Sequence, residues 1–306
     1  MSNGITERQK NKKNLMRLAA QRQLYRDAKN IERFNVFIAV IIPICLSLIS
    51  YIIRISDKMP FNIPLDTPDI AKFINFAACF LSIFMLLVST KMKHCKKEKI
   101  QVAATIQQEF DIDVFSMEWD EKLFGESINL NSKIARASQK IMNNEKERKD
   151  LVNWYRKEVD ELPLHEGVLA CQRSNFTWDQ NLRERYKLFL QFLFWFIILL
   201  QILIGVFRDC SLQDFLCNGV LPVLSALTWN TETIDGINSD LSFLNSKASP
   251  VFSRKKIQME KLYFIQRDIF EYRKSITMIP EWFYNFFKKE DEAHEQRNMR
   301  MNDGDM

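Results

Sequence analysis

Long uncharged segments are the feature of this sequence that most restricts its fold. Three segments of 18 to 20 residues contain no charged side chain: Val36–Ile53, Phe73–Thr90 and Leu188–Phe207. A fourth, Phe215–Trp229, is shorter and includes a glycine and a proline. A helix needs about 20 apolar residues to cross the hydrocarbon core of a bilayer. The first three segments meet this length almost unaided and the fourth meets it with its flanking residues, so we predict four membrane spans.

The uncharged segments make up about a quarter of the 306 residues, so most of the chain lies in water. We predict a predominantly all-α, polytopic membrane protein with a helical cytoplasmic domain inserted between the second and third spans. The predicted boundaries are an N-terminal cytoplasmic helix at 1–35, spans at 36–55, 73–90, 188–207 and 211–229, a cytoplasmic domain at 91–187 and a helical cytoplasmic region at 230–306.

Lysine and arginine residues near the span ends predict the orientation. They are dense in 17–33, 91–99 and 183–187 and sparse in the two remaining loops. Cytoplasmic loops carry such an excess of cations, so both termini and the 91–187 domain are predicted to face the cytoplasm. The net charge of +5 therefore lies beside the spans, where it suits anionic lipid headgroups better than DNA or RNA.

Hydrophobic spacing and prolines predict the remaining elements. Helices are expected at 11–35, running on into the first span, at 98–110, continuing out of the second span, and at 127–143, 150–161, 231–249 and 254–276. Residues 111–119 are expected to form a short strand or an extended turn. Pro163 is expected to open a helix that enters the third span, Pro250 to end a helix, and Pro280 to start a last, aromatic helix.

The helix expected at 254–276 carries a short heptad pattern. Its apolar residues at 3- and 4-residue spacing are Leu262, Ile265, Ile269, Tyr272 and Ile276. Two heptads are too few to establish a coiled coil. We favour packing of this helix against the cytoplasmic domain and keep a coiled coil as the alternative.

No pattern of catalytic or metal-binding residues is evident. The three histidines are scattered, and His165-Glu166 lacks a second histidine at position 169, where Leu169 stands. Seven glycines form no phosphate-binding loop, so neither an enzyme nor a bound cofactor is expected. Cys210 and Cys217 bracket the outer hairpin and could pair, although we favour two free thiols.

The four uncharged segments inside the predicted spans contain polar residues without charge, among them Ser47, Ser50, Asn75, Ser82, Gln201 and Asn218. Pumps and transporters usually carry acids or bases at this depth, so the pattern argues against them. Hydrogen bonds between helices are the favoured role of these residues, and lining a pore in an oligomer is the alternative.

The segment before the third span has a polar face. On a helix, Gln172, Asn175, Asp179, Arg183 and Tyr186 fall within an arc of about 80°. Asp179 and Arg183 form a pair at i,i+4 spacing. This face either packs against a neighbouring helix or forms a ligand-binding or gating surface coupled to the span.

Arginine and aromatic residues near this face suit a nucleotide. Arg173 could hold a phosphate, and Trp119, Trp154, Tyr155 or Trp178 could stack a base. Burial of these aromatic residues in the core is the alternative that we favour.

Several spaced segments resemble one known family, the SMODS-associating four-transmembrane effectors of bacteria. The resemblance covers nearly the whole chain. It rests on Leu18–Lys29, Ala103–Asp111 with Val114, Phe115 and Trp119, Trp154-Tyr155, Cys171–Asn175 with Trp178, Asp179, Leu182 and Arg183, Arg267–Lys274, and Pro280–Tyr284.

The resemblance implies a role in antiphage defence. Such proteins are expected to sit in the bacterial inner membrane and to respond to a cyclic oligonucleotide made by a partner synthase. The expected response is an oligomeric pore that damages the membrane and stops phage growth together with the cell. A non-catalytic membrane anchor that recruits a partner protein is the alternative, and a membrane-tethered enzyme is the third and weakest hypothesis.

Overall fold

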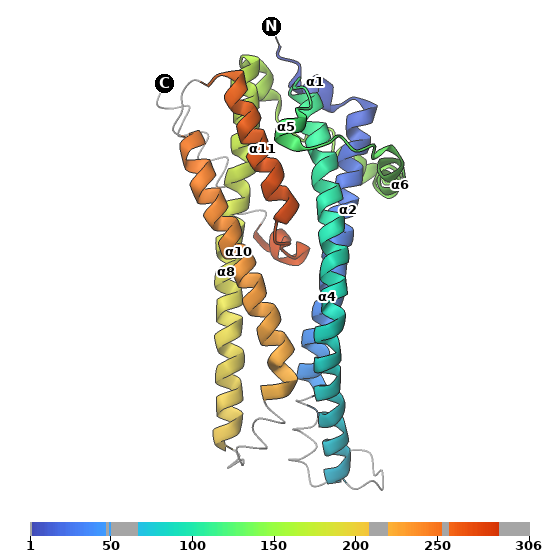
Figure 1. The fold of residues 1–306 in the computed structure, drawn as a ribbon, viewed down its shortest axis with the longest axis vertical. Helices are drawn as coiled ribbons and strands as arrows, with labels where there is room; N and C mark the ends of the chain where they lie inside the picture. The colour runs from blue at the N-terminus through green and yellow to red at the C-terminus, as the bar shows by residue number, and fades with distance from the viewer. Residues whose placement is uncertain (1, 47–48, 50–66, 208–219, 253–256, 288–306) are drawn as a thin grey trace. The chain divides into compact units, whose positions relative to one another are not determined.

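A computed structural model describes residues 2–46, 49, 67–207, 220–252 and 257–287. Every regular element in these ranges is a helix, which confirms the all-α class (Figure 1). The α-helices are α1 (Ile5–Gln9), α2 (Lys12–Val36), α4 (Thr67–Val114), α5 (Glu121–Phe124), α6 (Asn131–Met142), α7 (Glu145–Lys149), α8 (Leu164–Phe207), α10 (Leu221–Phe252) and α11 (Met259–Ser275). The structure also contains a π-helix, η1 (Phe37–Ile41), and a 3-10 helix, η2 (Lys157–Glu161).

The chain divides into two compact units. Unit 1 comprises Met1–Lys29, Lys96–Tyr186 and Ile237–Met306, and unit 2 comprises Asn30–Cys95 and Lys187–Gly236. Helices α2, α4, α8 and α10 each contribute residues to both units.

Helix α8 confirms the helix predicted between Pro163 and the third apolar segment. It begins at Leu164, and its first bonds include the one from the Gly167 amide to the Pro163 carbonyl at 2.9 Å. Proline suits this place because a helix start leaves its own N–H groups unbonded. The helix then runs without a break to Phe207. Among the described residues, the stretch Leu164–Leu203 is long and apolar enough to cross a membrane, and the structure provides one such helix in those ranges.

The strand or extended turn predicted at 111–119 is wrong in its first part. Helix α4 continues to Val114 and ends in a left-handed residue, Ser116, with φ of 54°. The Met117 amide donates to the Ile112 carbonyl at 2.9 Å, and the Ser116 amide donates to the Asp113 carbonyl at 3.3 Å. These two bonds form a Schellman cap, which satisfies carbonyl groups that the end of the helix leaves open.

The helix predicted at 150–161 is also wrong. Turns occupy 150–155, and only the short 3-10 helix η2 follows. The side chain of Gln9 explains the difference, because it accepts from the Tyr155 amide at 2.8 Å and donates to the Tyr155 carbonyl at 3.0 Å. A distant residue thus takes both backbone groups that an α-helix would use.

Helix α11 packs inside unit 1 as predicted. Leu262, Ile265, Ile269 and Tyr272 are buried in one core cluster with α4 and α8 residues, and Ile276 packs against that cluster. The heptad pattern therefore faces the core of its own unit and leaves no seam for a coiled coil.

Two proline predictions have different outcomes. Helix α10 runs through Pro250 to Phe252, so Pro250 does not end the helix. Pro280 does precede a helical turn at 281–287, where the amides of Phe283 and Tyr284 donate to its carbonyl at 3.1 and 3.2 Å.

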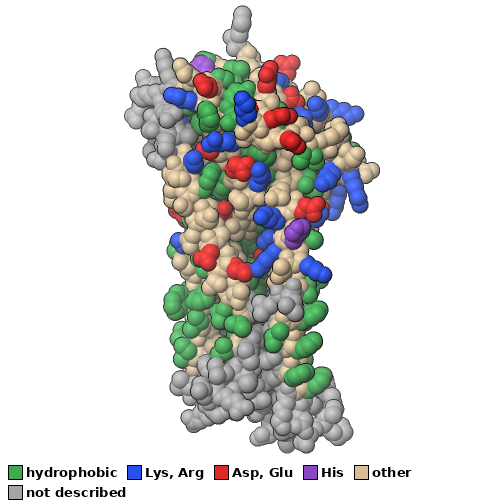
Figure 2. Space-filling model, in the orientation of Figure 1, with side chains coloured by type: hydrophobic (Ala, Val, Ile, Leu, Met, Phe, Trp, Pro, Cys, Tyr) green, Lys and Arg blue, Asp and Glu red, His purple; other side chains and the backbone are tan. Residues whose placement is uncertain are grey.

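Unit 2 exposes large apolar side chains, shown in green over that unit in Figure 2. On α4 and α8, exposed fractions are 71% for Phe73, 69% for Phe76, 69% for Phe192 and 66% for Trp195. A soluble surface rarely shows so large an apolar area, whereas helices in lipid expose one as a rule. Polar bonds inside unit 2 include the one from Asn230 Nδ2 to the Leu190 carbonyl at 3.0 Å.

Candidate ligand-binding cavity

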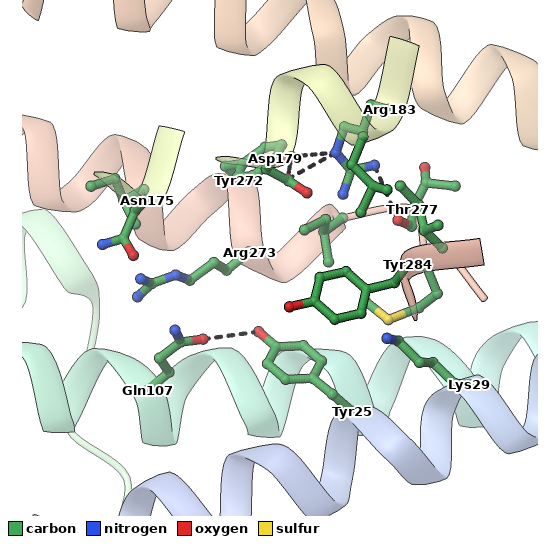
Figure 3. A pocket seen from close by; sticks show the side chains of 15 residues that line it. Tyr25, Lys29, Gln107, Asn175, Asp179, Arg183, Tyr272, Arg273, Thr277 and Tyr284 are labelled. Carbon is green, nitrogen blue, oxygen red and sulfur yellow. Dashed lines mark hydrogen bonds and ion pairs between the residues drawn. The ribbon is translucent and has the colours of Figure 1, made fainter. Parts of the chain in front are cut away.

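Unit 1 contains a cavity of about 310 Å³ (Figure 3). Its walls come from α2, α4, α8 and α11, from the extended segment that follows α11, and from the 281–287 turn. The lining residues are Tyr25, Lys29, Gln107, Asn175, Asp179, Leu182, Arg183, Ile269, Tyr272, Arg273, Ile276, Thr277, Met278, Ile279 and Tyr284.

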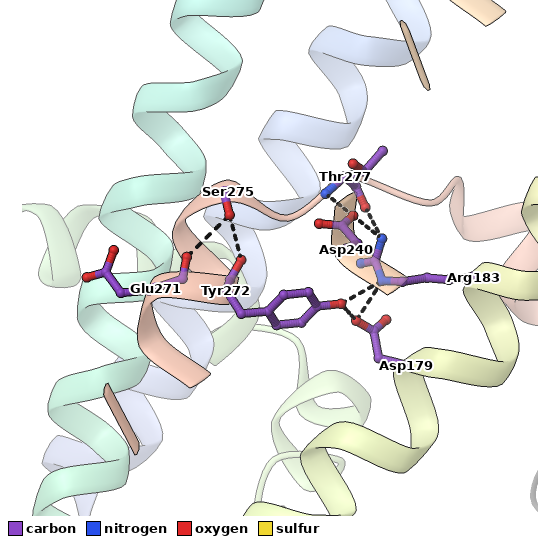
Figure 4. A network of polar contacts seen from close by, with 7 residues as sticks. All are labelled: Asp179, Arg183, Asp240, Glu271, Tyr272, Ser275 and Thr277. Atoms are coloured by element: carbon purple, nitrogen blue, oxygen red, sulfur yellow. Dashed lines mark hydrogen bonds and ion pairs between the residues drawn. The ribbon is translucent and has the colours of Figure 1, made fainter. Parts of the chain in front are cut away.

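Arg183 of α8 joins three parts of the wall (Figure 4). It is 1% exposed, and its Nη1 donates to Asp240 Oδ2 of α10 at 2.6 Å and to the Thr277 carbonyl at 3.1 Å. Its Nε donates to Asp179 Oδ2 at 2.9 Å and to the Tyr272 hydroxyl at 2.6 Å. The Tyr272 hydroxyl donates in turn to Asp179, and the Thr277 amide donates to Asp240 Oδ2 at 2.9 Å. The segment after α11 is therefore held to α8 and α10 by one buried guanidinium.

Arg273 of α11 forms a second buried pair. Its Nη1 donates to Asp111 Oδ2 of α4 at 2.5 Å, and the Asp111 side chain is 0% exposed. Asp111 also accepts from the Tyr155 hydroxyl at 2.8 Å and from Gln266 Nε2 at 3.0 Å. Arg273, Tyr155 and Gln266 thus all donate to the Asp111 carboxylate in the core beside the cavity, and a buried charge requires such partners.

Lys29 of α2 differs from the two arginines. Among the described residues, no ion pair neutralises its ammonium group, whereas Arg183 and Arg273 are bonded to carboxylates. Asp240 and Asp111 lie behind their arginines and do not line the cavity. The lining itself therefore presents three cations and one carboxylate, that of Asp179, to an incoming group. Such a surface favours an anion.

Burial shifts the pKa values of the groups around the cavity. It lowers the pKa of Lys29 below its ordinary value, and the charges of Glu281 and Asp179 offset this only in part. Burial raises the pKa of Tyr25. Burial alone would lower the pKa of Arg183, but the neighbouring acids, Asp179 foremost, outweigh it and raise that pKa. Arg183 is therefore a permanent cation, and Lys29 is the cationic group whose charge pH can change.

Tyrosines from two elements complete the wall. Tyr25 of α2 lies one helical turn before Lys29, and its hydroxyl contacts Gln107 Oε1 of α4 at 3.5 Å. Tyr284 enters the cavity from the 281–287 turn (Figure 3). Aromatic faces beside cations suit a ligand that joins a flat ring to an anionic group.

Three of the predicted site residues line the cavity, namely Asn175, Asp179 and Arg183. Other members of the polar face of α8 are buried against neighbours, as the packing alternative predicts, and ligand binding by the face stays a prediction. Gln172 donates to the Leu262 carbonyl at 3.1 Å and to Gln266 Oε1 at 3.0 Å.

The other predicted site residues lie elsewhere. Tyr155 is buried in the core and Trp154 packs against it, which is the alternative favoured from sequence. Arg173 is half-buried and is not among the lining residues. Trp178 belongs to α8, but its side chain lies outside the described part of the structure.

Sequence reasoning missed Lys29, Tyr25, Arg273 and Tyr284. They lie in segments that carry the family resemblance, Leu18–Lys29, Arg267–Lys274 and Pro280–Tyr284. The resemblance in these segments was the signal that could have pointed to them. Spacing within a single helix does not show that three distant segments line one cavity.

The polar residues of the predicted spans stay a prediction. Ser47, Ser50 and Asn218 lie outside the described residues, as do Cys210 and Cys217, and the side chains of Asn75 and Ser82 are not described either. Gln201 is half-buried on α8. Within the described ranges, no group of histidine, cysteine and acidic residues is arranged to hold a metal ion.

Comparison with known proteins identifies a relative and a family. The chain is 26% identical over 305 residues to a protein of Bacillus cereus (strain VD146) named a probable CBASS effector molecule, covering 97% of this chain and 98% of the relative. No solved structure matches the chain. The family description names a 4TM effector domain, which agrees with the predicted count of four spans. Since the match extends over residues 3–301, this chain belongs to the SMODS-associating 4TM effector domain family.

Proposed function

We propose that this protein is a CBASS effector of the bacterial inner membrane, gated by a cyclic oligonucleotide that binds the cavity of unit 1. The observation that carries the proposal is the lining: Lys29 without an ion pair among the described residues, beside the rings of Tyr25 and Tyr284. The named relative and the family supply the defence context.

The cavity volume limits how the ligand binds. Ligand pockets commonly span about 300–1,000 Å³, and 310 Å³ is at the lower end of that range. This space suits one nucleotide. A cyclic oligonucleotide therefore inserts one nucleotide, with its phosphate at Lys29 and its base at the tyrosines. The cavity can take in more of the ligand only if one of its walls moves.

The segment 276–280 is the wall best suited to move. It has no helix of its own, and Arg183 and Asp240 hold it through the carbonyl and amide of Thr277. A ligand phosphate competes with Asp179 and Asp240 for Arg183. A ligand that binds better when this segment is released shifts the population towards the released state.

Helix continuity supports transmission to the membrane. Asp179 and Arg183 line the cavity, and the same uninterrupted helix contains the uncharged residues 188–207. In the proposed mechanism, release of the wall lets α8 and α10 change their packing, and several copies then open an oligomeric pore. The predicted orientation, with both termini in the cytoplasm, places the cavity on the side where the messenger is made.

The scaffold alternative relied on two surfaces for a partner, the heptad residues of α11 and the aromatic C-terminal segment. The heptad residues face the core of unit 1, so only the aromatic segment still supports that alternative.

Calorimetric titration of cyclic di- and trinucleotides into the full-length protein in detergent tests the binding step. We expect Lys29→Ala to weaken binding about 10- to 100-fold, because a hydrogen bond to a charged group contributes about 1.5–3 kcal/mol. Arg173→Ala is the matched control and should bind like the unmodified chain, since Arg173 does not line the cavity. Equal affinity for both variants would remove the cavity from the mechanism.

The pH dependence of the same titration is a separate prediction. The charged form of Lys29 attracts the phosphate, and burial lowers its pKa below that of an ordinary lysine, about 10.4. Affinity should therefore fall as pH rises through this lowered pKa. Lys29→Arg, which stays charged, should abolish that fall. A pH profile that is identical in the two proteins would show that Lys29 does not hold the anion.

A further inference from the structure

We propose that the aromatic turn at 281–287 inserts Trp282 and Phe286 into the lipid headgroup region, so that unit 1 has its own membrane contact beside the spans. The three faces of this turn carry the argument. Spacing of four residues puts Trp282 and Phe286 on one face, and Phe283 and Phe287 on the next.

One face is fixed to α8. The ring of Phe283 packs edge-on against Tyr186 with centroids 4.9 Å apart, and the Arg185 guanidinium lies over the Phe287 ring at 4.9 Å. Phe283 is buried, at 4% exposed. These contacts fix the place of the turn along α8.

That place is the start of the apolar part of α8. Leu188, the first of the 20 uncharged residues, follows Tyr186 by two positions, which is about 3 Å along a helix. Aromatic side chains at this level match the belt of tryptophan and tyrosine residues found where spans meet the headgroups.

The outward face is unusually apolar for a surface in water. Trp282 is 57% exposed and Phe286 is 78% exposed. In the sequence, Lys288 and Lys289 follow directly, and each lysine near an anionic bilayer contributes about 1 kcal/mol of attraction. Exposed aromatic residues beside lysines, next to a span, fit lipid better than a soluble protein partner.

The third face links this contact to the cavity. Tyr284 lines the cavity, and the wall segment containing Thr277, Met278 and Ile279 leads directly into the turn. Movement of that wall therefore changes how deeply the aromatic residues can insert. The lipid contact itself does not depend on the identity of the ligand.

Site-specific photocrosslinking tests the lipid contact. Benzoylphenylalanine replaces Phe286 or Trp282 in the full chain, reconstituted in nanodiscs of phosphatidylethanolamine and phosphatidylglycerol. The matched control carries it at Phe264, a 44% exposed residue of α11 in the same unit. We expect a lipid adduct by intact mass in at least half of the crosslinked protein at 286 and 282, and at least fivefold less at 264.

Other outcomes would overturn the proposal. If position 286 crosslinks to a second copy of the chain or to another protein instead of lipid, the turn is a protein interface. If lipid adducts are equally frequent at 264 and 286, the outward face has no special membrane contact. Either result leaves the cavity and its titration unaffected, so this test and that of the proposed function fail independently.

Discussion

Arg183→Met is expected to lower the free energy of unfolding by about 3–5 kcal/mol, the usual effect of removing one partner from a buried ion pair. The side chains of Arg183 and Asp240 are 2% and 5% exposed, and the substitution leaves Asp240 and part of Asp179 without a cation. Methionine keeps most of the length and volume of the arginine side chain. The decrease in the free energy of unfolding therefore reflects the lost charge and hydrogen bonds more than empty space left in the core. Denaturant titration of the full chain in detergent micelles measures the change.

Two comparisons make this result specific. Arg26→Met removes a partly exposed pair with Glu147, whose side chains are 27% and 26% exposed, and should cost less than about 1 kcal/mol. Arg183→Lys keeps the charge but loses the planar fork that reaches Asp179 and Asp240 together, so its effect should lie between the two. If Arg26→Met and Arg183→Met were equally destabilising, the buried network would not hold unit 1 together.

Arg273→Met should cost a similar amount, about 3–5 kcal/mol, for the same reason. Asp111 is fully buried and Arg273 is its cationic partner, at 2.5 Å. In the double variant Arg273→Met with Asp111→Asn, the buried negative charge that has lost its cationic partner is also removed. The Tyr155 hydroxyl and Gln266 Nε2 donate to different oxygens of Asp111, so the one amide oxygen of asparagine can keep only one of these bonds, and part of the lost stability should return.

A double-mutant cycle in detergent measures this coupling. We expect a coupling energy above about 1.5 kcal/mol between Arg273 and Asp111, and near zero between Arg273 and Asp240, which do not share a bond in the structure. Additive effects of Arg273→Met and Asp111→Asn would contradict the pairing.

The long helices and part of the site could be predicted from sequence because they depend on local spacing. Helix α8 follows from Pro163 and an uninterrupted pattern, and the Asp179–Arg183 pair follows from its i,i+4 spacing. The bonds from Arg183 to Asp240 and Tyr272 cross 57 and 89 residues of sequence, and no local pattern indicates them.

The errors have the same physical origin. Residues 150–155 have a helical pattern, but Gln9, 146 residues away, bonds the Tyr155 backbone and holds a turn there. In the sequence, Lys29 is one of several cations that predict the membrane orientation. Its place in the cavity lining depends on α2, α4 and α11 meeting in unit 1, which a single sequence does not reveal.

Membrane potential in cells tests the central claim most directly. Cells express the full chain with a partner cyclic-oligonucleotide synthase, and a potential-sensitive dye compares the unmodified protein, Lys29→Ala and Arg173→Ala at equal expression. The account predicts depolarisation when the synthase is active, in the unmodified protein and in Arg173→Ala, and a response at least tenfold weaker in Lys29→Ala. Depolarisation that is equal with and without synthase activity and equal in the unmodified protein and Lys29→Ala would contradict the account. Cell death with an unchanged potential would also contradict it.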